Sequence, residues 1–140
     1  MDAIVVLPGE GEVLKGSRTG SAVIREAGPA LSVLEFALDP AHPGVAPHFH
    51  KLQIDSFYVL EGEVDFRIGD ETVRAPSGSY VSVPPGVVHG LVNAGASAAR
   101  LLNVHVPGGF AEYSRELNEL RLSGVEPDDA FFERHDIYDP

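Results

Sequence analysis

Residues 78–93 read GSYVSVPPGVVHGLVN, in which two valine-rich runs flank a proline-proline-glycine tripeptide. Pro84-Pro85-Gly86 is a rigid turn that a central strand could not contain, because proline cannot donate a ladder hydrogen bond. The flanking runs, residues 80–83 and 87–93, have the length and β-branched composition of short strands. The stretch therefore predicts a hairpin that carries His89 at a fixed place beyond the turn.

The rest of the chain is broken in the same way into short extended runs. Its 15 glycines and 11 prolines are spread along the sequence rather than gathered in a linker. Gly69-Asp70 lies between two such runs and is typical of a hairpin turn. We expect strands at residues 4–7, 22–26, 31–38, 55–60, 64–68, 71–75, 80–83, 87–93 and 100–106. This density of strands predicts an all-β fold, an antiparallel double-sheet jelly-roll barrel.

The C-terminal tail has a helical pattern instead. Phe110, Tyr113 and Leu117 recur at the spacing of one helix face, and Gly124 is a suitable stop. Residues 127–129, Pro-Asp-Asp, read as the first turn of a second helix. We therefore expect a barrel over residues 1–109 and a short helical annex over residues 110–140 packed on it, in a single domain.

Three histidines and one carboxylate form a candidate metal site. His48 and His50 are two residues apart, so in an extended strand their imidazoles point to the same face. Asp55 lies nearby, and the hairpin supplies a third imidazole, His89. Such a mixed nitrogen and oxygen set suits one divalent transition metal ion, namely Fe, Mn, Ni, Co, Cu or Zn. One or two positions on the ion would stay open, as in a catalytic site.

The remaining histidines have ordinary explanations, since a single histidine is more often a satisfied or exposed side chain than a ligand. His42 falls in a turn and His135 near a helix end, and we expect both on the surface. His105 shares a strand face with Leu101 and Asn103. We expect His105 to end in solvent. The alternative is an acid/base group, or a partner that holds a ligand, if that face looks into the barrel.

Composition limits the classes of partner. The chain carries 10 Lys+Arg against 21 Asp+Glu, a formal charge of −11. Such acidity repels nucleic acid and anionic membrane surfaces, so we expect neither as a partner. The absence of cysteine excludes disulfides, thiolate ligands and cysteine nucleophiles. The N-terminal apolar run is too short for a signal peptide, so we expect a cytoplasmic protein. The partner that we expect is a small molecule.

The spacing of these residues resembles that of a known family. Residues 44–62 read G-x3-H-x-H-x4-D-x6-G, and residues 78–93 read G-x5-P-x-G-x2-H-x3-N. The two stretches resemble the paired motifs of the cupin superfamily, and the second matches at every specified position. The first departs at its leading glycine, and it has Asp55 where the family usually has Glu. The resemblance implies four metal ligands, His48, His50, Asp55 and His89.

The difference at Asp55 leaves its exact role open. Aspartate is one methylene shorter than glutamate, so its carboxylate could bind the ion directly, hold a metal-bound water or orient a histidine. Gln53 lies close in the sequence and is an alternative oxygen ligand, although it falls outside the family spacing.

Within that superfamily, the chain resembles small bacterial quercetinase-like cupins, in which a single barrel is followed by a segment such as residues 107–110, Pro-Gly-Gly-Phe, and a helix. This similarity implies a metal-dependent dioxygenase of flavonol-like or enolisable substrates, with Asp55 as the catalytic group that takes the substrate's hydroxyl proton. The alternatives are a redox-neutral metal-dependent isomerase, cyclase or hydrolase, or a non-catalytic small-molecule-binding cupin. We also expect a homodimer, in which an N-terminal strand at residues 3–7 adds to the partner's sheet.

Overall fold

The computed structural model of the chain describes residues 3–15, 20–40 and 42–140. Within them, the first five strands are β1 (Glu12–Leu14), β2 (Gly20–Ala27), β3 (Ser32–Leu38), β4 (Val45–His48) and β5 (Ile54–Glu61). The other five are β6 (Glu63–Ile68), β7 (Glu71–Pro76), β8 (Tyr80–Val83), β9 (His89–Val92) and β10 (Ala99–Val106). Two helices follow, α1 (Phe110–Leu122) and α2 (Asp129–Arg134).

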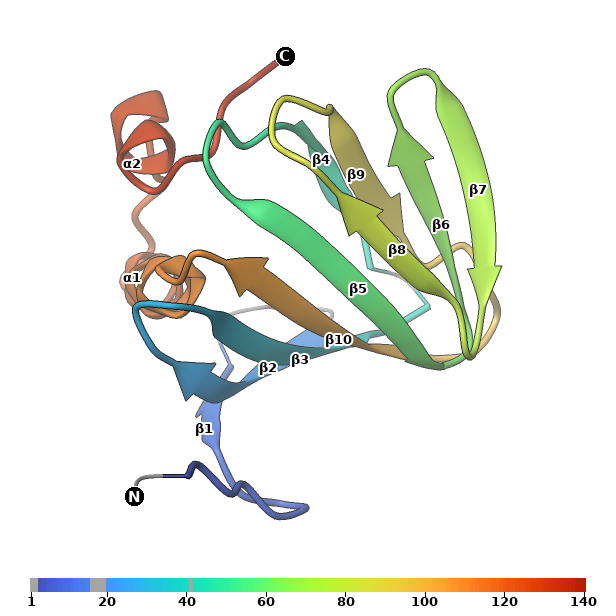
Figure 1. The fold of residues 1–140 in the computed structure, drawn as a ribbon, viewed down its shortest axis with the longest axis horizontal. Helices are drawn as coiled ribbons and strands as arrows, with labels where there is room; N and C mark the ends of the chain where they lie inside the picture. The colour runs from blue at the N-terminus through green and yellow to red at the C-terminus, as the bar shows by residue number, and fades with distance from the viewer. Residues whose placement is uncertain (1–2, 16–19, 41) are drawn as a thin grey trace.

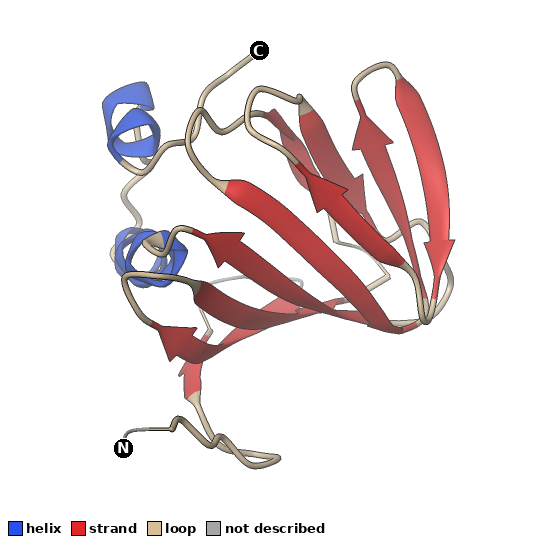
Figure 2. Cartoon of the chain, viewed as in Figure 1, coloured by secondary structure: helices blue, strands red, loops and turns tan. Residues whose placement is uncertain are grey.

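The strands form two antiparallel sheets, drawn as two layers in Figures 1 and 2. One sheet has the order β1-β2-β3-β10-β5-β8 and the other β4-β9-β6-β7. The turn at Gly69-Asp70 joins β6 to β7, and the proline-rich turn joins β8 to β9 across the two sheets. Both helices lie at the same end of the sheets. The structure confirms the expected all-β jelly roll with a short C-terminal helical segment.

The hydrophobic core lies between the sheets because β5, β6 and β10 bury every second side chain over most of their length. On β5, Asp55, Phe57 and Val59 are buried, whereas Tyr58 between them is exposed. Asp55, Phe57 and Val59 therefore share one inward face of β5. The β6 side chain of Phe66 is fully buried against that face, and it anchors the core.

A second apolar cluster attaches the first helix. Ala111 of α1 is buried together with Leu14, Ile24 and Leu34 of the strands below it. The burial of these side chains removes apolar surface from water, which stabilises the fold by about 25 cal/mol for each Å² buried. The helix is thereby fixed against β1, β2 and β3, beside the open end of the barrel where β10 ends.

One expected strand is absent, and two strands, β1 and β4, were not expected. Residues 4–7 are not a strand, and Ile4, Val5 and Leu7 are more than half exposed. The edge beside β2 is taken by Glu12–Leu14 instead, whose three residues pair with β2. Strand β4 was not among the expected strands. It is the edge strand of its sheet and contains Pro47, so it lacks the apolar alternation that marks longer strands.

The expected homodimer stays a prediction, and so does the addition of residues 3–7 to a partner's sheet; within the single chain, residues 4–7 are not part of a sheet. In the described ranges no helix combines the length and the apolar character that a bilayer crossing requires.

Candidate metal centre

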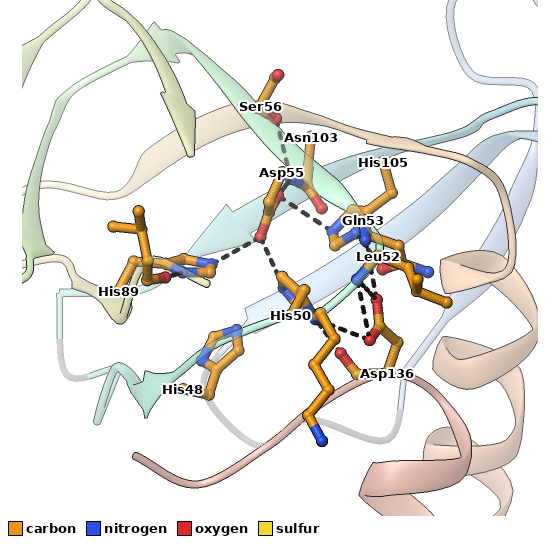
Figure 3. A network of polar contacts seen from close by, with 12 residues as sticks. His48, His50, Leu52, Gln53, Asp55, Ser56, His89, Asn103, His105 and Asp136 are labelled. Carbon is orange, nitrogen blue, oxygen red and sulfur yellow. Dashed lines mark hydrogen bonds and ion pairs between the residues drawn. The ribbon is translucent and has the colours of Figure 1, made fainter. Parts of the chain in front are cut away.

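Strand register brings the predicted ligands together at one end of the barrel. His48 on β4 lies directly opposite His89 on β9, in one sheet. Asp55 on β5 lies directly opposite His105 on β10, in the other sheet. His50 follows the end of β4, and its ring turns towards Asp55 as well (Figure 3). Side chains from both sheets therefore meet in one place.

The four predicted ligands are close enough to share an ion. His48, His50, Asp55 and His89 each offer a ligand atom, and these atoms all lie within 4.8 Å of one another. The ring centroids of His48 and His89 are 4.4 Å apart, and those of His50 and His89 are 5.2 Å apart. His50, Asp55 and His89 are buried and His48 is half-buried. The structure thus provides a compact cluster of three imidazoles and one carboxylate.

Backbone carbonyls fix the tautomer of all three imidazoles. The Nδ1 of His48 is 2.8 Å from the Ala46 carbonyl oxygen, and that of His89 is 3.0 Å from the Val87 carbonyl oxygen. The Nδ1 of His50 is 2.7 Å from the carbonyl oxygen of Asp136. A carbonyl oxygen can only accept, so each Nδ1 must donate its proton. Each neutral ring then keeps a lone pair on Nε2, which is the state that a metal ligand needs.

The Asp55 carboxylate reaches the same point despite its shorter side chain. Its Oδ2 lies 2.9 Å from the Nε2 of His89 and 3.3 Å from the Nε2 of His50. Two ligand atoms that each lie about 2.1 Å from one ion are about 3.0–3.4 Å apart at octahedral to tetrahedral angles. The two separations lie within about 0.1 Å of that range, so Asp55, His50 and His89 fit a first-row transition metal ion, with the ligand atom of His48 within 4.8 Å of theirs.

The other carboxylate oxygen of Asp55 is held by β10. Oδ1 accepts a hydrogen bond of 2.6 Å from the Asn103 amide. It also lies 3.1 Å from the Nε2 of His105, but the angles at that contact are not those of a hydrogen bond. Asn103 also donates to the Ser56 carbonyl, at 3.0 Å. These contacts keep the carboxylate from rotating, so that Oδ2 faces the histidines.

The expectation that His105 ends in solvent was wrong. Its side chain is 1% exposed, its Nδ1 donates to the Gln53 amide oxygen at 2.8 Å, and its ring stacks on Phe110 at 3.8 Å between centroids. The amide oxygen of Gln53 is therefore occupied by His105, so Gln53 does not serve as the alternative oxygen ligand in this arrangement. Gln53 and Phe110 instead hold the imidazole that faces Asp55.

The pKa values in the cluster favour the ligand forms of two residues. Burial, together with the neighbouring imidazoles, lowers the pKa of His48 to about 4, so its ring is neutral near pH 7. Burial alone would raise the pKa of Asp55, but the adjacent His105 and the hydrogen bonds of His50 and His89 outweigh it and hold that pKa well below its usual range. At neutral pH the carboxylate is ionised.

Proton binding competes with an ion at His50. Burial opposes its protonation, but the hydrogen bonds with Asp55 and with the Asp136 carbonyl outweigh burial and raise the pKa of His50. An ion would take the place of that proton between the ring and the carboxylate, because both occupy the same lone pair.

A cavity of about 1110 Å³ leads to the cluster. Its wall near the cluster is mainly aromatic and aliphatic, with Phe36, Phe57, Leu101, Phe110 and Tyr113. The polar groups at that end are His48, Asp55, Asn103 and His105. An apolar wall with a few convergent polar groups is the usual form of a small-molecule site.

Sequence reasoning missed two residues that hold the cluster. Asn103 had a signal, because its alternation with Leu101 and His105 places all three on one face of a strand. Asp136 had none, since it lies 86 residues from His50 in the sequence and no local pattern marks it.

Comparisons with known proteins agree with this arrangement. The sequence profile described as "Cupin domain" matches residues 34–105, which is more than half of the chain. Quercetin 2,3-dioxygenase from Bacillus subtilis (strain 168) is 26% identical over 98 residues. That match covers 68% of this chain and 29% of the dioxygenase, so the chain spans less than a third of that relative.

Two solved structures are similar over most of their own length. TT1209 from Thermus thermophilus is 30% identical with a TM-score of 0.60, over 64% of this chain and 84% of that one. KdgF from Halomonas sp. has a TM-score of 0.69 at 19% identity, over 76% of this chain and 94% of that one, and this likeness concerns the fold alone.

Proposed function

The chain belongs to the cupin family, and from this premise we propose that it is a metal-dependent enzyme that acts on a small organic molecule. We propose a dioxygenase of flavonol-like or enolisable substrates. The proposed metal ligands are His48, His50, Asp55 and His89.

One observation carries the metal site. Three imidazoles donate Nδ1–H to backbone carbonyls, and the Nε2 atoms of two of them, His50 and His89, lie 3.3 and 2.9 Å from one ionised carboxylate oxygen of Asp55. In a metal-free protein an Nε2 lone pair can face the carboxylate only if a proton lies between them, as the raised pKa of His50 indicates, and without that proton the two would repel each other in a buried site. A divalent cation relieves that repulsion. When bound, a divalent transition metal supplies Lewis acidity and, if redox-active, one-electron chemistry with O₂.

The chain's own residues suit a flat apolar substrate with an acidic hydroxyl. Phe36, Phe57 and Phe110 line the cavity beside the cluster and offer faces on which an aromatic ring can pack. Burial raises the pKa of the Tyr113 hydroxyl to about 12, so this group stays protonated and can donate a hydrogen bond. These features beside the cluster support a phenolic or enolic substrate.

Asp55 is the proposed proton acceptor. Its lowered pKa makes it a weak base, so enols and phenols, whose hydroxyls are more acidic than those of alcohols, are the better proton donors for it. Asn103 holds its Oδ1, and His105 lies behind it to stabilise the charge. The likeness to quercetin 2,3-dioxygenase supports the same substrate class.

Metal content and oxygen uptake test the proposal together. We expect wild-type protein purified without a metal-chelating tag to hold about one ion per chain, and His89→Ala to hold little. His42→Ala is the control, because His42 is a half-buried histidine outside the cluster. Fe-, Mn-, Ni- and Co-loaded protein should consume O₂ with flavonols or catechols.

The alternatives give different results in the same experiment. Bound zinc together with product formed under anaerobic conditions would favour a redox-neutral isomerase, cyclase or hydrolase. A small molecule bound tightly and recovered unchanged would favour a non-catalytic cupin. Absence of O₂ uptake with every loaded ion and substrate would end the dioxygenase proposal.

A further inference from the structure

The last residues of the chain return to the metal-binding segment. Tyr138 forms an isolated antiparallel bridge with Phe49, in which each backbone N–H donates to the other's carbonyl at 3.0 Å. The rings of the two residues also stack, at 5.5 Å between centroids. Figure 1 shows this part of the chain running from α2 to the loop that joins β4 and β5. We name residues 136–138 the C-terminal clasp.

Asp136 contacts that loop through both its backbone and its side chain. Its carbonyl oxygen accepts the Nδ1–H of His50 at 2.7 Å. Its carboxylate accepts the backbone N–H groups of Lys51 at 2.8 Å, Leu52 at 3.0 Å and Gln53 at 2.9 Å (Figure 3). Three successive N–H groups that no strand pairs are thus satisfied by one side chain.

The backbone of Asp136 is in an unusual conformation. Its φ is +63°, in the left-handed region, and it is the one residue other than glycine with positive φ in the described part of the chain. An aspartate in the left-handed region of backbone conformation is less stable than one in the usual regions. The contacts around Asp136 must therefore offset this cost in folding free energy. The conformation lets the carbonyl and the carboxylate of Asp136 face the same loop.

The sheet alone does not place His50. Strand β4 ends at His48, so His50 has no ladder partner, and its backbone is fixed by the Gly86 N–H, 2.7 Å from its carbonyl, and by the neighbouring clasp contacts. The loop that Asp136 holds runs directly from His50 to Asp55. His50 therefore takes its position largely from contacts with the clasp, whereas Asp55 at the other end of the loop is also fixed by its ladder partners on β8 and β10.

We propose that Asp136 is a positioning residue of the metal centre and that the docking of the clasp and the binding of the ion are coupled. This inference rests on the proposed metal site. The clasp presets the tautomer of His50 and the path of the loop. Partners that orient a metal-binding histidine commonly change metal affinity by about 10- to 100-fold when removed. Coupling is reciprocal, so the ion must in turn hold the clasp in place.

Variants that remove one contact at a time test the proposal. Asp136→Gly keeps the carbonyl and tolerates the positive φ, but it removes the acceptor of three N–H groups. A chain ending at His135 also removes the carbonyl that holds His50. Asp136→Asn keeps one acceptor oxygen. Asp139→Asn, three residues further on and exposed, is the matched control.

Zinc affinity is measured for each variant by competition with a chelator, using the metal alone. We expect Asp139→Asn to bind as wild type, Asp136→Asn to bind more weakly, and Asp136→Gly to bind about 10-fold more weakly. The truncated chain should lose up to about 100-fold. A thermal melt of the truncated chain in chelator shows whether that chain is folded. If it is unfolded, the zinc affinity of Asp136→Gly alone is compared with that of wild type.

Two further measurements separate positioning from general stability. Long-range ¹H–¹⁵N spectra of the metal-free protein, recorded at a pH high enough for the His50 ring to be neutral, should show the Nδ1–H tautomer in wild type and a mixture in the truncated chain. Saturating zinc should slow amide hydrogen exchange at Phe49 and Tyr138, whose N–H groups form the bridge. Unchanged exchange, or equal zinc affinity in wild type and Asp136→Gly, would overturn the coupling.

The inference and the proposed function fail in different ways. A wild-type protein that binds no ion would remove the metal site and the coupling with it. Tight binding without O₂ uptake would remove only the dioxygenase chemistry and would leave the coupling intact. Tight binding that the variants do not weaken would remove only the role of Asp136.

Discussion

Replacing Asp55 with asparagine separates its role as a metal ligand from its role in packing. The two side chains have the same shape, and the site is buried, so the outcome depends on hydrogen bonding alone. The new amide oxygen can face the Asn103 amide, which now donates to Oδ1 at 2.6 Å. The new NH₂ then faces the Nε2 atoms of His50 and His89, whose lone pairs can accept it. In the metal-free variant the amide oxygen and the NH₂ group of the new side chain thus both have hydrogen-bond partners.

The magnitudes follow from this geometry. Hydrogen bonds to a charged group contribute about 1.5–3 kcal/mol and neutral ones about 1 kcal/mol, so we expect metal-free Asp55→Asn to lose about 1–2 kcal/mol of unfolding free energy. Metal binding should suffer far more, because the NH₂ group replaces an anionic ligand at the point where the ion would sit. We expect at least about 100-fold weaker zinc binding, or about 2.7 kcal/mol.

Urea denaturation in chelator and zinc competition measure the two effects. The control is Asp65→Asn, which removes the same charge from a carboxylate on β6 that binds Arg74 far from the cluster. Zinc affinity of Asp55→Asn within about threefold of wild type would refute the assignment of Asp55 as a ligand. Loss of the fold in chelator would instead refute the argument that the amide can be accommodated.

Three other changes have definite expected results. Gly90→Ala would place a Cβ 2.6 Å from the Val45 carbonyl oxygen, so it should separate β4 from β9, lower the melting temperature and weaken zinc binding. In metal-free protein the pKa of His48 is about 4 in the folded chain and 6.5 in the unfolded chain. As the pH falls, the unfolded chain therefore binds the proton first. The contribution of His48 to the free energy of unfolding is lost as the pH drops from 6.5 towards 4. His48→Gln should flatten that fall in urea denaturation series at pH 7 and pH 4.5. Phe66→Ala, at a fully buried site, should cost about 3–5 kcal/mol of unfolding free energy.

The parts of the fold that were predictable follow from local patterns. Alternation along residues 55–60 identified the buried face of β5, and Gly69-Asp70 identified a hairpin, because side-chain period and turn chemistry act over a few residues. The spacing of His48 and His50 indicated a shared direction even though His50 lies beyond the strand.

The parts that were missed depend on distant contacts. The apolar run at residues 4–7 has the composition of a strand, but a strand needs a free sheet edge, and Glu12–Leu14 occupies the edge of β2. His105 could face either way until its register with Asp55 on β5 was known. Asp136 acts through its carbonyl and its carboxylate on a loop more than eighty residues away, so nothing near it in the sequence marks the role.

The cluster takes His48 and His89 from one sheet and Asp55 from the other. An ion held among them would act as a removable cross-link in a chain that has no cysteine with which to build a permanent one. Chelation should therefore let the two layers loosen at the cluster, while the core around Phe66 and Phe57 keeps them packed beside it. Entry of a bulky molecule and loss of the ion would then depend on the same local opening.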